Sequence, residues 1–342
     1  MKALVKYATG KGFMQVQEMP EPVLQAGHVV VEVKATGICG TDLHIQSGEY
    51  PVDPPVILGH EFSGVVAETA PDVTDVQIGQ RVTALVYFIT CGTCEFCNTG
   101  QWNLCPKRKS IGSGVNGAFA SYVLVPKRNI RTLPENVDFH SGALIEPFAC
   151  CTHGVIEKSR LKPGDIAIVL GPGVIGLLTA QIAVAAGATV ILAGMSADKE
   201  RMQLSKTLGT QYTVDIENES MTEFVETLTL GRGADIVFEC SGAGAAAKQG
   251  LQLARRKGQF VQLGLFGKPI ELDWDSIMLR EIEIQNSFAS TWHSWNAALR
   301  LVAQGMVQLS PMISAVLPLS GWEEAFEKFR NRQGLKYVLV PI

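Results

Sequence analysis

Hydrophobic positions in the first part of the chain form short, valine-rich runs that are bounded by Gly, Pro or Asp. Runs of this length between turn residues are typical of antiparallel strands. We therefore predict a β-rich domain over residues 1–150. The runs behind this prediction are HVVVEVKAT (28–36), EFSGVVAET (61–69), QRVTALVYF (80–88) and FASYVLVP (119–126).

The pattern changes after residue 165, where apolar runs alternate with amphipathic stretches. Each amphipathic stretch begins near a small or polar residue and ends at Gly, as a capped helix does. This alternation predicts an α/β domain with a doubly wound parallel sheet over residues 151–290. The predicted strands are 166–170, 189–194, 212–216, 234–240, 259–265 and 281–288, and the predicted helices are 174–187, 196–209, 220–231 and 244–258.

The last segment, residues 291–342, carries two amphipathic helix patterns and the strand-like run KYVLVPI. We expect this segment to return to the first domain. Two domains also fit the length, because 342 residues with 46% hydrophobic content exceed what one ordinary core holds.

Composition excludes several classes of partner. A net charge of −4 with scattered Lys and Arg gives no basic surface for nucleic acid or an anionic membrane. The uncharged stretch from Ile166 to Ala197 is interrupted by Gly and Pro, which favours a packed sheet over a membrane helix. We expect a cytoplasmic protein whose partner is a small molecule, since the N-terminus does not resemble a secretory signal.

A glycine motif follows the strand predicted at 166–170 and begins the helix predicted at 174–187. Gly171, Gly173 and Gly176 satisfy G-x-G-x-x-G, with Val174 and Ile175 between the last two. In this context the glycines allow a tight turn, a close approach of the backbone to a pyrophosphate, and close packing of helix on strand. The motif predicts a dinucleotide site; the alternative is a turn used only for packing.

The position that usually holds an acidic residue for the ribose hydroxyls is occupied by Gly194. Ser196, Lys199 and Arg201 follow and could accommodate a 2′-phosphate, although the two cations could also form a solvated helix face. The choice between NAD and NADP stays open with a lean to NADP. Lys336 is a further candidate for contact with the pyrophosphate.

Four of the eight cysteines lie within fifteen residues, at positions 91, 94, 97 and 105. Four thiols at this spacing can fill all positions of a tetrahedral Zn²⁺, which is typical of a structural site. Local disulfides or a reduced cluster are the alternatives. The sequence therefore predicts structural zinc at Cys91, Cys94, Cys97 and Cys105.

A second set of ligand types is dispersed along the chain: Cys39 in GICGTDLH, His60 and Glu61 in LGHE, and Glu146 in IEPF. Together they offer the thiolate, imidazole and carboxylate ligands of a catalytic zinc that keeps one position for substrate. Zinc would acidify a bound alcohol, which prepares it to release hydride to a nicotinamide. Thr41 could accept the proton and His44 could pass it to solvent; a turn hydroxyl and a surface histidine are the alternatives.

The ordered set GICGTDLH, GHE, the four-Cys loop, IEPF and GPGVIG resembles the zinc-dependent medium-chain dehydrogenase/reductase family over nearly the whole chain. The resemblance implies a GroES-like catalytic domain, a Rossmann coenzyme domain with the active site between them, and a homodimer or homotetramer. Classical alcohol dehydrogenases have Cys where this chain has Glu146. The Glu form is similar to the sorbitol, threonine and butanediol dehydrogenase branches, which shifts the expected substrate to polyols and sugars.

The expected activity is thus hydride transfer between a secondary alcohol, polyol or sugar-derived substrate and NAD(P). Two alternatives stay open at this stage. One is a zinc-free reductase of activated double bonds, which would have no use for the ligands Cys39, His60 and Glu61. The other is a non-enzymatic or regulatory small-molecule-binding protein that has kept the fold.

Overall fold

The computed structural model describes residues 1–341 and divides the chain into two compact units. Unit 1 comprises Met1–Pro147 and Leu309–Ile342, and unit 2 comprises Phe148–Gln308. The return to unit 1 therefore begins later than the expected residue 291. Hydrogen bonds explain this: Thr291 Oγ1 donates to Glu157, and Gln181 exchanges two bonds with the backbone of Gln308.

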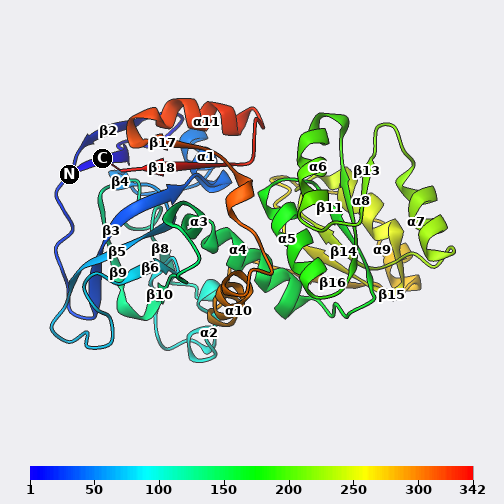
Figure 1. Cartoon of the computed structure of the whole chain (residues 1–342), viewed down its shortest axis with the longest axis horizontal. Coiled ribbons are helices and arrows are strands. Elements are labelled where there is room, and N and C mark those ends of the chain that lie inside the picture. Colours follow the sequence, from blue (N-terminus) through cyan, green and yellow to red (C-terminus); the bar gives the residue numbers. More distant parts are fainter. Residues whose placement is uncertain (342) are drawn as a thin grey trace. The chain divides into compact units, whose positions relative to one another are not determined.

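Unit 1 is built on β3 (His28–Gly37), which pairs antiparallel with β5 (Glu61–Thr69), β9 (Tyr122–Pro126) and β18 (Lys336–Val340). The predicted final strand is thus confirmed as part of the first unit (Figure 1). The predicted strand 80–88 is divided into β6 (Arg81–Ala84) and β7 (Tyr87–Ile89). The other strands are β1 (Lys2–Lys6), β2 (Met14–Glu18), β4 (Val56–Ile57), β8 (Lys109–Ser110), β10 (Ile130–Thr132) and β17 (Ile313–Pro318).

Helices in unit 1 are short and lie between strands. Val29, Val31 and Val33, which alternate along β3, pack with Phe62 and Val66 of β5 in a buried core. The helices are α1 (Gly40–Ser47), α2 (Glu95–Asn98), α3 (Phe139–Ala143) and α11 (Trp322–Arg330), and α4 (Ile145–Thr152) begins in unit 1 and continues into unit 2.

Unit 2 contains a parallel sheet with the order β13-β12-β11-β14-β15-β16, which is the 3-2-1-4-5-6 order of a doubly wound dinucleotide fold. Helices cover both faces of the sheet (Figure 1). The strands are β11 (Ile166–Leu170), β12 (Thr189–Gly194), β13 (Tyr212–Asp215), β14 (Ala234–Glu239), β15 (Ala254–Gln262) and β16 (Glu283–Asn286). The helices are α5 (Val174–Ala185), α6 (Lys199–Thr207), α7 (Met221–Thr229), α8 (Gly244–Leu253), α9 (Trp274–Leu279) and α10 (Trp292–Ala303).

One helix prediction in this unit is wrong at its end. The helix predicted over 244–258 stops at Leu253, and residues 254–258 belong to β15. Arg255 is held by Asp235 on the neighbouring strand, and Lys257 has φ 56°, outside the helical region. A π-helix over His153–Lys158 was also not predicted. Among residues 1–341, no helix is both long and apolar enough to span a bilayer.

Candidate functional site

The four cysteines of the loop between β7 and β8 converge on one point. Their sulfur atoms all lie within 4.8 Å of one another. Cys91 Sγ is 3.8 Å from Cys97 Sγ and 3.7 Å from Cys105 Sγ. A tetrahedron with Zn–S bonds of about 2.3 Å has edges of about 3.8 Å. The two sulfur separations at Cys91 therefore match the edges of a zinc tetrahedron.

Backbone amides in the same loop point at the sulfurs. Cys91 N donates to Cys105 Sγ over 3.3 Å, and Cys94 N donates to Cys91 Sγ over 3.3 Å. Hydrogen bonds from the amides of Thr93 and Cys94 lower the pKa of Cys91 to about 5. All eight cysteines are free thiols within the described chain, which argues against the disulfide alternative. With four thiols around one point, this site leaves no position for a substrate.

The second group brings together Cys39, His60 and Glu61, whose ligand atoms lie within 4.8 Å of one another. Strand pairing explains how distant residues meet, because Glu61 on β5 is opposite Gly37 on β3 and Cys39 follows β3 directly. A Cβ at Gly37 would lie 2.4 Å from Glu61 Oε2, so only glycine leaves room for this carboxylate. A thiolate, an imidazole and a carboxylate in one place fit a zinc that retains an open position.

Asp42 is a site residue that sequence reasoning missed. It is fully buried, accepts a hydrogen bond from Cys39 N over 2.9 Å, and places Oδ1 3.9 Å from His60 Nδ1. Burial raises the pKa of Asp42 to about 6, and Oδ1 has no hydrogen-bond partner. A carboxylate beside the second nitrogen of a metal-ligating histidine is a common arrangement that orients the ring. Asp42 at the third helix position after the cap Cys39 was the available signal.

Lys336 requires a correction. Its side chain is buried, and Nζ donates to Glu61 Oε2 over 2.6 Å, to Oε1 over 2.9 Å and to Ile38 O over 2.9 Å. Burial lowers the pKa of Lys336, but the charges of Glu61, Cys39 and Glu146 and the hydrogen bond to Glu61 together outweigh this, and the net pKa is raised. Three N–H groups thus already face three acceptors, which leaves none for the expected pyrophosphate contact. The lysine is instead the partner of a candidate zinc ligand.

Glu146 lies in the first turn of α4 and is largely buried. It falls outside the group of Cys39, His60 and Glu61, but it is near enough for its charge to act on both His60 and Lys336. Burial lowers the pKa of His60, whereas Cys39, Asp42 and Glu146 raise it to a net value well above the usual range. This excess of negative groups around one imidazole is the environment that a divalent cation would neutralise.

The two expected relay residues differ in position. Thr41 Oγ1 lies 3.7 Å from Cys39 Sγ, so its hydroxyl is beside the metal group. His44 is exposed and its Nδ1 is 2.6 Å from Glu49 Oε2. Within the described chain no hydrogen bond joins Thr41 to His44. The structure therefore places one residue at the site and the other at the surface of the same helix.

The glycine motif in unit 2 has the geometry that its pattern predicted. Gly171 has φ +96°, and a Cβ on Gly176 would lie 1.8 Å from Gly171 O. Gly173 caps α5, which begins with Val174 and Ile175, and a Cβ there would meet no other atom within 4 Å. The open space above the helix N-terminus is where a pyrophosphate would lie.

Two of the residues expected near the ribose, Ser196 and Arg201, already have partners. Ser196 Oγ donates to Asp215 Oδ2 over 2.7 Å, and Arg201 forms an ion pair with Asp198. Lys199 begins α6. Gly194 is required by packing, because a Cβ would lie 2.8 Å from Pro172 Cγ. Sequence alone did not show that the carboxylates of Asp198 and Asp215 lie beside the residues that were expected to contact the ribose.

Comparisons with known proteins cover both units. Residues 25–135 match the alcohol dehydrogenase GroES-like domain, and residues 174–304 match the zinc-binding dehydrogenase domain. A sorbitol dehydrogenase of Halalkalibacterium halodurans is 42% identical over 100% of both chains. A D-arabitol-phosphate dehydrogenase of Enterococcus avium is 41% identical over 99% of this chain and 97% of that protein. A crystal structure of a zinc-binding dehydrogenase from Sinorhizobium meliloti 1021 bound to NADP has a TM-score of 0.89, with 35% identity and 99% coverage of both chains.

The matches agree with the geometry at three independent places. The thiol group fits a structural zinc, the Cys39 group fits a catalytic zinc, and the sheet order with its glycine motif fits a dinucleotide. The chain therefore belongs to the zinc-binding, medium-chain alcohol dehydrogenase family and is an oxidoreductase that uses zinc and a nicotinamide coenzyme.

Proposed function

We propose that this enzyme interconverts a secondary alcohol and the corresponding ketone on a polyol or a polyol phosphate. The observation that carries the proposal is the mixed group of Cys39, His60 and Glu61, which the fold assembles with a position left for substrate. Glu146 in place of a cysteine, and the sorbitol and D-arabitol-phosphate dehydrogenases among the relatives, support the polyol class.

Zinc in this group would act as a Lewis acid that makes a substrate hydroxyl acidic, and a nicotinamide would accept the hydride. Cys39 and His60 would hold the ion, and the Asp42 carboxylate, 3.9 Å from His60 Nδ1, would help to orient the His60 ring. Lys336 holds the Glu61 carboxylate in place through two hydrogen bonds. The Thr41 hydroxyl, beside Cys39, would accept the proton from the substrate oxygen and give up its own proton to water, through which exposed His44 could pass it on to solvent.

The corner beside β12 supports a coenzyme of either type. Gly194 leaves the usual acidic residue out, which favours a 2′-phosphate, and a relative of known structure is bound to NADP. Asp215 and Glu217 at Ser196 oppose a further negative charge. We therefore propose NAD(P) without a choice between the two. The cytoplasmic location and the homodimer or homotetramer stay predictions.

The test is a reduction screen with NAD⁺ and NADP⁺ in parallel over sorbitol, other pentitols and hexitols, their phosphates, L-threonine and simple secondary alcohols. Zinc content is measured on the same preparation. Turnover of a polyol or polyol phosphate at least about tenfold better in kcat/KM than that of a simple alcohol supports the proposal. Zinc without turnover of any alcohol would favour a binding protein instead, and turnover of activated double bonds without zinc would favour a zinc-free reductase.

A further inference from the structure

A cavity in unit 2 lies away from the glycine motif. Its volume is about 580 Å³, and it is lined by the end of α7, the turn after it, and the junction of α8 with β15. These segments meet where β14 and β15 begin. The glycine motif follows the opposite, carboxyl end of β11, which is the edge where dinucleotides bind. The cavity is therefore separate from the coenzyme edge of the same sheet.

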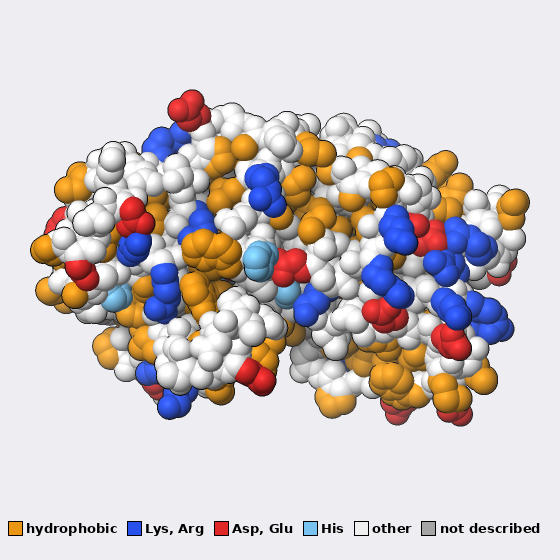
Figure 2. Space-filling view, turned by 90° about the horizontal axis from the view of Figure 1, so that it is seen from below, with side chains coloured by type: hydrophobic (Ala, Val, Ile, Leu, Met, Phe, Trp, Pro, Cys, Tyr) orange, Lys and Arg blue, Asp and Glu red, His pale blue; other side chains and the backbone are white. Residues whose placement is uncertain are grey.

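Arginine dominates the lining of this cavity. Arg232, Arg255, Arg256 and Arg280 line it together with one carboxylate, Glu226. Figure 2 shows Lys and Arg side chains gathered, together with some carboxylates, on one face of unit 2. With Asp235 included, four positive side chains face two negative ones, which gives the cavity a net positive charge.

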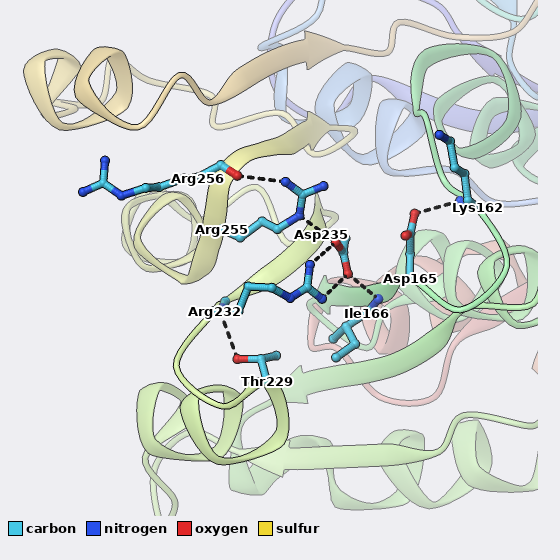
Figure 3. A network of polar contacts seen from close by, with 9 residues as sticks. Lys162, Asp165, Ile166, Thr229, Arg232, Asp235, Arg255 and Arg256 are labelled. Carbon is cyan, nitrogen blue, oxygen red and sulfur yellow. Dashed lines mark hydrogen bonds and ion pairs between the residues drawn. The ribbon is translucent and has the colours of Figure 1, made fainter.

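Asp235 holds two of the arginines side by side (Figure 3). Arg232 Nη1 and Nη2 donate to its two oxygens over 2.6 and 2.9 Å, and Arg255 Nε donates over 2.6 Å. Burial would raise the pKa of Asp235, but these bonds and the Ile166 amide hold it well below its usual range. The two guanidinium groups are thus oriented before any ligand arrives, which reduces the entropy lost on binding.

Donors remain available after these internal bonds are made. A guanidinium carries five N–H donors. Arg255 uses Nε toward Asp235 and Nη1 toward Arg256 O, and exposed Arg256 uses Nη1 toward Leu279 O. Arg280 is different, because its three nitrogens bond carbonyls at the end of α8 and Ser276. Arg280 therefore builds the wall. Figure 3 shows the Arg256 side chain pointing away from Arg255 and Arg232, which both point at Asp235, so Arg256 is the arginine that is turned away from this ion pair and keeps free N–H groups.

We propose that this arginine-lined cavity binds the phosphoryl group of a small phosphorylated metabolite. Guanidinium groups match phosphate oxygens in pairs of parallel hydrogen bonds, which lysine cannot do. The volume falls within the range of pockets for small organic ligands and exceeds the need of an inorganic ion. Val225, Leu253 and Ala254 supply apolar lining for the carbon skeleton. The site is independent of the proposed alcohol chemistry.

The test is calorimetric titration of the zinc-loaded enzyme with inorganic pyrophosphate, AMP and glucose 6-phosphate, with and without saturating reduced coenzyme. Binding at the cavity persists when coenzyme is present, whereas binding at the glycine motif is displaced. AMP and glucose 6-phosphate distinguish a nucleotide from a sugar phosphate. An affinity weaker than about 1 mM for all three probes overturns the proposal.

Matched variants locate the site. Arg256→Gln should weaken binding at least about tenfold, because it removes charge-assisted donors from an exposed side chain. Lys257→Gln removes the same charge from the next residue, which does not line the cavity, and should change affinity less than about twofold. Glu226→Gln should tighten binding by roughly twofold or more, a gain that misfolding cannot produce. Equal affinity in the wild type and Arg256→Gln overturns the proposal.

Discussion

The two metal groups of unit 1 are made in opposite ways. The thiol group takes four identical ligands from one loop, residues 91–105, and its amides stabilise its own sulfurs. The Cys39 group takes different ligands from the N-cap of α1 and from the start of β5, and a buried lysine shares one of them. A closed site can take all of its ligands from one short segment of the chain. An open site whose ligands come from distant segments depends on the surrounding fold to bring them together, and here also on Lys336 to pair with the buried carboxylate of Glu61.

The largest expected difference between the groups is in activity. Cys39→Ser should lower kcat/KM at least about 10⁴-fold, since an ion that activates the hydroxyl contributes several kcal/mol to the barrier. One equivalent of zinc should be lost and the melting temperature should change little. Zinc analysis, steady-state kinetics and thermal unfolding measure these effects. Cys240→Ser, a thiol outside both groups, is the control and should keep all its zinc; full activity of Cys39→Ser would refute the assignment.

The next largest effect concerns Glu61, the candidate zinc ligand that is hydrogen-bonded to Lys336. Lys336→Met should destabilise the metal-free protein by about 3–5 kcal/mol, because it leaves the Glu61 carboxylate buried without a cation. In the zinc-loaded protein the decrease in the free energy of unfolding should be smaller if the zinc ion binds the Glu61 carboxylate in place of Lys336. Chemical unfolding with and without zinc measures the difference.

Lys6→Met is the matched control for this experiment. Lys6 is also buried, but its Nζ bonds only the carbonyls of Gly10 and Gly12. Its effect on the free energy of unfolding should therefore be the same with and without zinc. The same zinc-independent loss in Lys336→Met would show that Glu61 does not bind the ion.

Cys94→Ser should lower the stability of the protein and leave its activity largely unchanged, which is the opposite of the effect expected for Cys39→Ser. A closed site contributes mainly to folding, so we expect a loss near 3 kcal/mol, which lowers Tm by roughly 6–12 °C. The value of kcat per folded molecule should stay within about threefold of wild type. Scanning calorimetry and kinetics at low temperature separate the two effects. Unchanged Tm with one zinc fewer would contradict the structural role.

The smallest effect tests the hydroxyl beside the open group. Thr41→Val should lower kcat about a hundredfold, because the hydroxyl that takes the proton is removed. Thr41→Ser keeps the hydroxyl and should retain most of the activity. Both variants should keep two equivalents of zinc, since the side chain is outside the ligand group. Equal rates for the valine and serine variants would exclude Thr41 from proton transfer.

Sequence predicted those parts of the molecule whose cause is local. The Cys91–Cys105 spacing and the glycine motif each contain their own geometry, so both were found in the chain alone. The contact of Lys336 with Glu61 was not predicted from the sequence, because it depends on the pairing of β18 with β3. The end of α8 at Leu253 likewise depends on the contact of Arg255 with Asp235. Long-range strand pairing and ion pairs decide these features.

Unit 1 is discontinuous, with all of unit 2 inserted between its two segments. A ribosome therefore delivers Cys39, His60 and Glu61 long before it delivers Lys336. Until that lysine emerges, the nascent chain presents a thiol, an imidazole and an unneutralised carboxylate to whatever cations the surroundings contain. The contact of Lys336 with Glu61 can therefore form only after both segments of unit 1 have been synthesised.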